Sequence, residues 1–244
     1  MRTSNKILLG SFITTTVILV GIHVSLYAKY KKGDFIDIVN ENALRFNMQI
    51  LPGVKYVSAT GLGHFNIIAS DTLKIETEKN HPSQLRVSVE GETLVITGDT
   101  LISRNAFQDR QRTYSPVNLY LPSSVKVKID FCEMELHGSP DSLSSKSYDF
   151  ELTETSMMIG DDTPERNDNT PVLYWKQLDI KADKRSSIKL FRNVKISGMN
   201  LLMNESSIHD NNSDIGQLNL QTDDKSSINL SGATVKKLNL TPKQ

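Results

Sequence analysis

Two glutamates, Glu133 and Glu135, lie two residues apart in the stretch FCEMELH and could form a catalytic pair. On a strand both side chains would point to one face, and paired carboxylates cleave glycosidic bonds in polysaccharide-degrading enzymes. Alternation alone also places polar side chains on the solvated face of a strand. We therefore interpret the pair as part of a solvated face and keep a glycan-active β-helix enzyme as an alternative.

A second candidate site is the polar stretch from Gly160 to Pro171, because hard oxygen ligands of the kind that calcium prefers gather there. These ligands are Asp161, Asp162, Glu165, Asn167, Asp168 and Asn169. They lack the ligand spacing and the fixed glycine of a known calcium loop. We interpret the stretch as a disordered polar loop and predict no metal site.

The single cysteine, Cys132, excludes an internal disulfide and alternates with Met134 and Leu136, which indicates a buried apolar role. The sequence has no Walker loop, no dinucleotide fingerprint, no HExxH motif and no cysteine pair at zinc spacing. GLGHF, from Gly61, resembles a phosphate loop, but no helix is expected after it. We predict no catalytic residue, no cofactor and no enzymatic activity.

The 28 basic and 28 acidic side chains cancel to a formal charge of zero. A nucleic-acid-binding surface needs an excess of cations to displace counterions from phosphates. We therefore predict no nucleic acid partner.

The segment Ile7–Ala28 runs 22 residues without a formal charge and is followed by three lysines within four positions. A helix of that length measures about 33 Å, which matches a hydrocarbon core of roughly 30 Å. A cleaved signal peptide is the alternative, but Leu26 stands where a cleavage site needs a small residue. We predict an uncleaved transmembrane anchor in residues 1–32, a connector at 33–55 and one further domain at 56–244.

The anchor gives way to short runs of alternating apolar residues such as TLKIETE, QLRVSVE and ETLVITG, separated by turn-forming residues. This pattern is typical of all-β architecture. The charged stretch Leu101–Pro116 interrupts it and is expected to be a long loop. The alternation changes phase at Phe131–Cys132, which predicts a bulge or corner there.

Ser-Ser-Ile returns every twenty residues, at Ser186, Ser206 and Ser226. Pairs of apolar residues around one polar residue return in step with it, as in Leu178-Asp179-Ile180 and Leu218-Asn219-Leu220, although Met199-Asn200-Leu201 arrives one residue late. A fixed period of this size indicates stacked units. Because each unit contains only short strands, we predict a β-solenoid with coils of roughly 20 residues.

In such a stack Ile188, Ile208 and Ile228 would lie above one another at the strand spacing of roughly 4.8 Å, as would Leu190 and Leu230. Each coil is too thin to bury its own apolar face, so burial depends on its neighbours. The paired serines fit a corner, because they tolerate turn geometry and bond to the backbone. The stretch YDFELTETSMMIG resembles the repeats, which extends the stack back to about residue 120.

The outward positions between these apolar residues have little in common. Lys189, His209 and Asn229 would form one column that shares no chemistry. We interpret this column as solvated.

The stretches FNIIASDTLKIETEK, QLRVSVEGETLVITG and VNLYLPSSVKVKIDFCEMELHG, together with the C-terminal repeats, resemble the bacterial auto-transporter adhesin, head GIN domain family. The resemblance covers Tyr56 to Leu240 and implies a secreted or envelope β-solenoid domain. The sequence departs from the pattern in having the Ser-Gly-Ala turn once, at Ser231-Gly232-Ala233, and an N-terminal anchor. The resemblance transfers no catalytic or binding residue.

Three functions follow from this interpretation. The first is a noncatalytic envelope protein, held in the membrane by Ile7–Ala28, whose extracytoplasmic solenoid serves adhesion, scaffolding or surface contact. Its partner would be an envelope protein or a glycan, in the periplasm or on the cell surface. The alternatives are an extracytoplasmic sensor of an envelope signalling system and the glycan-active enzyme.

Overall fold

The computed structural model describes residues 3–32, 46–79, 85–98, 117–160 and 171–242. The chain divides into two compact units, residues 1–45 and 46–244. The predicted loop at 101–116 lies outside the described residues, as do positions 161–170 of the predicted Gly160–Pro171 loop, which hold the six candidate calcium ligands.

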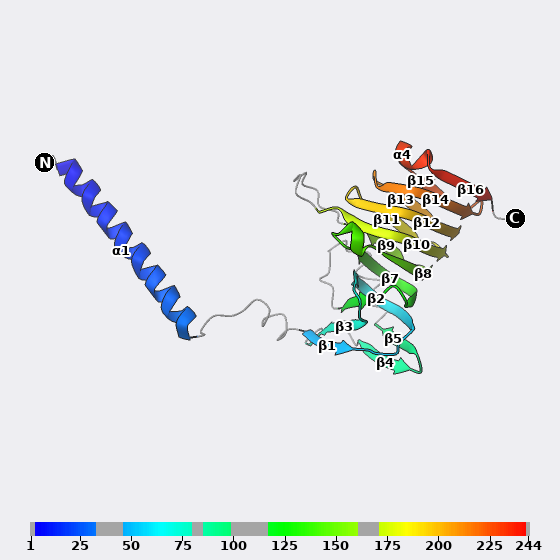
Figure 1. Cartoon of the computed structure of the whole chain (residues 1–244), viewed down its shortest axis with the longest axis horizontal. Coiled ribbons are helices and arrows are strands. Elements are labelled where there is room, and N and C mark those ends of the chain that lie inside the picture. Colours follow the sequence, from blue (N-terminus) through cyan, green and yellow to red (C-terminus); the bar gives the residue numbers. More distant parts are fainter. Residues whose placement is uncertain (1–2, 33–45, 80–84, 99–116, 161–170, 243–244) are drawn as a thin grey trace. The chain divides into compact units, whose positions relative to one another are not determined.

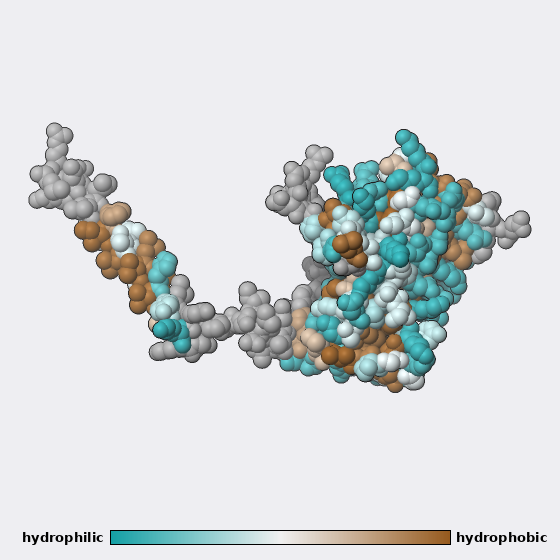
Figure 2. Space-filling view, in the orientation of Figure 1, coloured by the Kyte–Doolittle hydropathy of each residue, from teal (hydrophilic) through white to brown (hydrophobic). Residues whose placement is uncertain are grey.

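The described residues of the first unit form the helix α1 (Thr3–Lys32), which includes all of the predicted Ile7–Ala28 segment. Its three consecutive threonines do not interrupt it, because each hydroxyl donates to the carbonyl four residues earlier, as Thr15 does to Ser11 at 3.0 Å. Apolar side chains such as Val17 and Val20 are exposed. Figure 2 shows hydrophobic residues, in brown, along the described part of the helix.

Among the residues that the structure describes, no helix has both the length and the apolar character needed to cross a membrane. The helical conformation predicted at Ile7–Ala28 is thus confirmed by α1. The predicted membrane span is not confirmed.

The second unit is all-β, as predicted, and its strands form one sheet in the described residues (Figure 1). The main ladder runs in parallel through seven strands: β2 (Tyr56–Ala69), β7 (Lys126–His137), β8 (Lys146–Thr153), β10 (Leu173–Asp183), β12 (Val194–Asn204), β14 (Asp214–Thr222) and β16 (Leu238–Pro242). A second parallel ladder begins at the end of β7 and continues through β9 (Ser156–Ile159), β11 (Ser187–Leu190), β13 (Ser207–Asp210) and β15 (Ser227–Asn229).

Antiparallel strands complete the sheet at its N-terminal end. They are β1 (Phe46–Ile50), β3 (Lys74–Glu78), β4 (Arg86–Glu90), β5 (Thr93–Thr97) and β6 (Val117–Leu121). β5 and β6 also pair in parallel with β2, which joins this end to the main ladder. The helical segments in the described part of this unit are short: η1 (Ser142–Ser144) and α4 (Gly232–Val235).

The predicted apolar column is present in the second ladder. Ile188 pairs with Ile208, and Ile208 with Ile228, in parallel register. The column continues backwards through Met157 to Met134, so it includes strands that carry no Ser-Ser-Ile motif. Each strand of the ladder thus covers apolar side chains of its neighbours. A single pair of strands would leave these side chains exposed to solvent.

The paired serines occupy corners between the two ladders, as predicted. Ser186 and Ser206 are buried, and the hydroxyl of Ser206 donates to the carbonyl of Ala182 in the preceding turn of the chain at 3.0 Å. The residues just before them, Arg185 and Glu205, have positive φ angles of 64° and 51°. Such left-handed residues turn the chain from one ladder into the next.

These corners also explain the repeat that arrives one residue late. The first corner contains two left-handed residues, Lys184 and Arg185, whereas the next contains only Glu205. The extra residue is absorbed in the corner, so Leu178 still pairs with Met199 in register.

The predicted phase change at Phe131–Cys132 is confirmed. Phe131 has a positive φ of 54°, and Ile129 before it and Cys132 after it both point into the core. The pairing between β2 and β7 shifts register at the same level, between Thr60 and Gly63. The GLGHF stretch is therefore a bulge inside a strand, which agrees with the interpretation that it is not a phosphate loop.

Two details of the predicted stack were wrong. Leu190 pairs with Asp210, so no leucine column runs directly from Leu190 to Leu230. The parallel stack also begins before residue 120, because β2 (Tyr56–Ala69) pairs with β7 along most of its length. The amino-acid sequence of β2 does not match the repeat. It can still pack in the same stack, because the core requires apolar side chains of suitable size rather than particular residues.

Candidate functional site

One outward row of side chains crosses the main ladder from β8 to β16. The strands are in register, so Asp149, Asp179, Asn200, Asn219 and Asn239 fall side by side. On each strand the residues before and after this position are directed inwards, as alternation requires. In each repeat the polar residue between two apolar ones therefore has its side chain on the outer face of the sheet.

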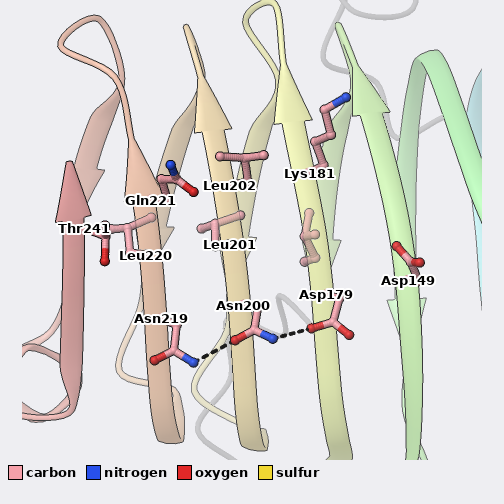
Figure 3. A pocket seen from close by; sticks show the side chains of 11 residues that line it. Asp149, Asp179, Lys181, Asn200, Leu201, Leu202, Asn219, Leu220, Gln221 and Thr241 are labelled. Carbon is pink, nitrogen blue, oxygen red and sulfur yellow. Dashed lines mark hydrogen bonds between the residues drawn. The ribbon is translucent and has the colours of Figure 1, made fainter. Parts of the chain in front are cut away.

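The amides of this row form a continuous hydrogen-bonded ladder. Asn239 donates to Asn219 at 3.0 Å, Asn219 donates to Asn200 at 2.7 Å, and Asn200 donates to the carboxylate of Asp179 at 2.7 Å. Figure 3 shows the last two bonds as dashed lines across three neighbouring strands. All three amides donate in the same direction, and the ladder ends on a carboxylate that can only accept.

Two glutamines support the ladder from one side. Gln177 donates to Asp179 at 3.0 Å, and Gln217 donates to Asn219 at 3.2 Å. The Gln177 side chain lies where a side chain of Gly198 would otherwise be, because a Cβ on that glycine would approach the Gln177 Oε1 to 2.2 Å. Gly198 thus allows the glutamine to lie flat over the neighbouring strand and hold Asp179 in place.

A hollow of about 400 Å³ opens on this outer face, and Asp179, Asn200 and Asn219 of the ladder are part of its lining. Figure 3 shows a second row of labelled side chains above the ladder: Lys181, Leu202, Gln221 and Thr241. We call the ladder, this second row and Asp149 together the ladder face. It offers amide donors, amide acceptors, carboxylate oxygens, a hydroxyl and one leucine, which suits recognition of a ligand rich in hydroxyl groups.

Both lysines near the ladder face are partnered by carboxylates. Lys126 Nζ lies 3.3 Å from Asp149, and Lys181 Nζ lies 3.4 Å from Asp183. The face therefore has no strong excess of either charge, which favours neutral hydrogen-bonding ligands over highly charged ones.

The two glutamates considered as a catalytic pair lie elsewhere, on the outward side of β7. Glu135 is half-buried between two imidazoles, with its oxygens 3.8 Å from His64 Nε2 and 3.6 Å from His137 Nε2. Glu133 pairs in register with His64 and Ser156 on the adjacent strands. The structure thus brings histidines beside these glutamates, a proximity that sequence reasoning did not predict.

A second amide chain runs from β2 away from these glutamates. Asn66 donates to Asn118 at 3.0 Å, and Asn118 donates to Glu76 at 3.3 Å. Tyr120 also donates to Glu76, at 3.1 Å. This chain, like the ladder, ends on a carboxylate, but no hollow among those described is lined by it.

Cys132 is fully buried, as predicted. Burial raises the pKa of its thiol to about 12, against the smaller opposing effect of hydrogen bonds such as that from the Leu62 amide. The thiolate is the nucleophilic form, so this cysteine is chemically inert in the folded chain.

No group of three or more His, Cys, Asp or Glu side chains in the described ranges is arranged to hold a metal ion. The outward column Lys189, His209 and Asn229 lies in register as predicted, and Asn229 Nδ2 lies 3.0 Å from His209 Nδ1. Sequence reasoning missed the ladder face itself. The sequence did contain a signal for it. The polar residue between the two apolar ones is Asp179 in one repeat and an asparagine in the next three, at Asn200, Asn219 and Asn239.

No family model and no curated protein matches the chain. The resemblance to the head GIN domain family is therefore still a prediction. A crystal structure of a candidate adhesin from Parabacteroides merdae ATCC 43184 is similar at 11% identity and a TM-score of 0.29, covering 82% of this chain and 95% of that one.

A candidate cell adhesion protein from Clostridium sporogenes ATCC 15579 is similar at 13% identity and a TM-score of 0.27, covering 82% of this chain and 99% of that one. TM-scores this low carry no argument about this chain.

Proposed function

We propose that this chain is a noncatalytic binding protein of the cell envelope that contacts glycans or envelope proteins through the ladder face. The observation that carries the proposal is the hydrogen-bonded row from Asn239 to Asp179 beside a hollow of about 400 Å³. Such a row fixes the direction of every amide before a ligand arrives, so little side-chain entropy is lost on binding.

The ligand that fits this face best is a hydroxyl-rich chain such as a neutral glycan. A hydroxyl group both donates and accepts, so it can bond to the Asp179 carboxylate and to the second amide hydrogen of a neighbouring asparagine. Ladder positions repeat at the strand spacing of roughly 4.8 Å, which allows contacts with several units of one extended polymer. Repeated weak contacts of this kind give avidity rather than a single tight pocket.

A β-solenoid fold and membership of the head GIN domain family are part of the same proposal. The in-register parallel pairing of β10, β12 and β14, and of β11 and β13, supports coils of about twenty residues. A stack of this type gives a stiff, extended surface, which is what an adhesion or scaffolding role needs.

Attachment to a membrane through Ile7–Ala28 completes the proposal. The 22 residues without a formal charge and the exposed apolar side chains of α1 support it. The remainder of the chain would then lie outside the cytoplasm, in the periplasm or on the cell surface.

Binding of the whole chain to an array of neutral and acidic glycans tests the ladder face. Asn219→Leu removes one donor and one acceptor from the middle of the ladder, so we expect at least tenfold weaker binding of the glycans that the unaltered chain retains. A loss of about 1.4 kcal/mol, roughly one or two hydrogen bonds, is enough for that change. His209→Leu, an exposed position on the other ladder, is the matched control and should leave binding unchanged.

Two results would contradict the proposal. Equal binding by the Asn219→Leu variant would place the ligand elsewhere. Release of glycan fragments in the same incubations, lost on Glu133→Gln, would show that the chain is an enzyme.

A further inference from the structure

The last strand of the main ladder, β16, leaves one of its edges open. In the described residues it pairs with β14 alone. Figure 1 shows it at the end of the stack of strands, in red. One of its two leucines is consequently uncovered: Leu240 is 56% exposed, whereas Leu220, its partner in the same column, is 2% exposed. An open strand edge of this kind is a ready template for another strand.

The edge lacks the commonest protection against such pairing, which is charge. Edge strands are normally guarded by charged side chains, but Leu238–Pro242 has the sequence LNLTP and contains no charge. Pro242 stands at the final position, where it removes one donor without interrupting the strand before it. The formal charge of zero for the whole chain also adds no general repulsion between copies.

The backbone groups at this edge have a definite alternation. The amide of Leu218 donates to the carbonyl of Lys237 at 3.1 Å, so Lys237 and Asn239 direct their backbone groups towards β14. Leu238 and Leu240 must therefore direct theirs outwards, to the open edge. These two residues lie symmetrically about Asn239.

Antiparallel pairing with an identical edge satisfies all of these groups. With a two-fold axis at Asn239, Leu238 of one copy faces Leu240 of the other, and each such pair exchanges two backbone hydrogen bonds. Asn239 then faces itself across the axis in the close, non-hydrogen-bonded position. Each Asn239 amide keeps one N–H for Asn219 and has a second for the other copy, so the ladder continues from one molecule into the next.

We infer that two copies of this chain associate through β16, edge to edge and antiparallel, with the two-fold axis at Asn239. The joined sheet then carries two ladder faces connected through the Asn239 pair. A dimer of this form is closed by its symmetry and does not grow into a filament.

Disulfide trapping of the full-length chain tests the inference. Asn239→Cys places a thiol opposite its own copy, where Cβ atoms of a non-hydrogen-bonded pair lie about 4.5–5.5 Å apart. We expect mild oxidation to convert most of this variant into a covalent dimer. Asn219→Cys, in the same row but one strand further in, is the matched control and should give at least tenfold less dimer. The natural Cys132 is buried and adds no background.

A second variant separates this interface from association through any other part of the chain. Leu240→Asp puts two carboxylates into the interface at a position that is already exposed, so folding should be unaffected. In the Asn239→Cys background we expect it to reduce dimer yield at least tenfold. Absence of dimer with Asn239→Cys alone overturns the inference, as would occur if β16 paired instead with β1 (Phe46–Ile50) of another copy. Equal trapping of Asn219→Cys, or no effect of Leu240→Asp, overturns it as well.

Discussion

Asp210 is a carboxylate at a core position, and its surroundings explain how the fold tolerates it. It stands next to Leu190 in register and is only 6% exposed. It accepts hydrogen bonds from the Ser213 amide at 2.8 Å, the Ser213 hydroxyl at 2.6 Å, the Thr234 hydroxyl at 2.6 Å and the Ser231 amide at 3.2 Å. Ser231 is the N-cap of α4, so this carboxylate ties the last helix to the stack.

These bonds make the stability of the chain depend on pH. Burial alone would raise the pKa of Asp210, but the hydrogen bonds from Ser213, Thr234 and Ser231 outweigh burial and lower it from 3.8. A group whose folded pKa is lowered stabilises the fold above its unfolded pKa and loses that contribution as the pH falls through the folded value. The contribution of Asp210 is thus fully present at neutral pH, begins to decline near pH 3.8 and is lost as the pH falls through the lower pKa of the folded chain.

We predict that Asp210→Asn lowers the free energy of unfolding by about 1–3 kcal/mol at pH 7, because an amide NH₂ then faces donors that need an acceptor. Below pH 3.8 the difference between the two proteins should shrink, since the natural carboxyl becomes protonated. Urea unfolding at pH 7 and pH 3 measures both values. Glu90→Gln, an exposed carboxylate on β4, controls for the loss of one charge, and an equal effect there would contradict the prediction.

At the scale of the strands, the burial of each apolar column depends on the neighbouring strands of the ladder. Ile208 lies between Ile188 and Ile228 and is 1% exposed, whereas Ile228 lies at the end of the column and is 40% exposed. Isoleucine thus occurs in two settings that differ mainly in whether a further paired strand follows it in the ladder.

We predict that Ile208→Ala lowers the free energy of unfolding by about 2–5 kcal/mol, the usual cost of a cavity in a packed column. Ile228→Ala should cost roughly 1 kcal/mol, because much of this side chain is already in water. Chemical unfolding followed by far-UV circular dichroism measures both, and each variant is the control for the other. Equal losses would mean that burial between neighbouring strands is not what stabilises the column.

The strands could be predicted from the sequence wherever the twenty-residue repeat or the alternation of apolar residues was evident. Ser-Ser-Ile at twenty-residue spacing predicted the register of Ile188, Ile208 and Ile228, and the change of parity predicted the turn at Phe131. Both signals work because apolar residues must face the core.

The remaining elements could not be predicted, because their positions in the sheet depend on partners that are distant in sequence. The antiparallel strands β1 and β3 show the same alternation as any other strand, and alternation does not specify a partner. The ladder face was missed for a related reason. A single outward asparagine is unremarkable on one strand, and its hydrogen bond appears only when Asn200 is set beside Asn219 by the stack.

At the scale of the whole molecule, the chain combines a helical unit and an all-β unit that face different physical demands. The second unit buries its apolar residues between successive strands, whereas Val17 and Val20 on α1 are exposed in the first. Exposed side chains of this size, within 22 uncharged residues, need an apolar environment. Our proposal assigns that environment to a membrane.

We predict that the full-length chain sediments with membranes and stays there after alkaline carbonate treatment. The double substitution Val17→Arg and Val20→Arg should release it, since each arginine near the middle of a bilayer costs about 2.5–3.5 kcal/mol. Val17→Leu with Val20→Leu keeps the apolar character and is the matched control. If carbonate releases the unaltered chain, α1 does not span the bilayer. Equal retention of the arginine variant would show that attachment comes from the β-unit instead, because the two arginines alter nothing beyond the helix.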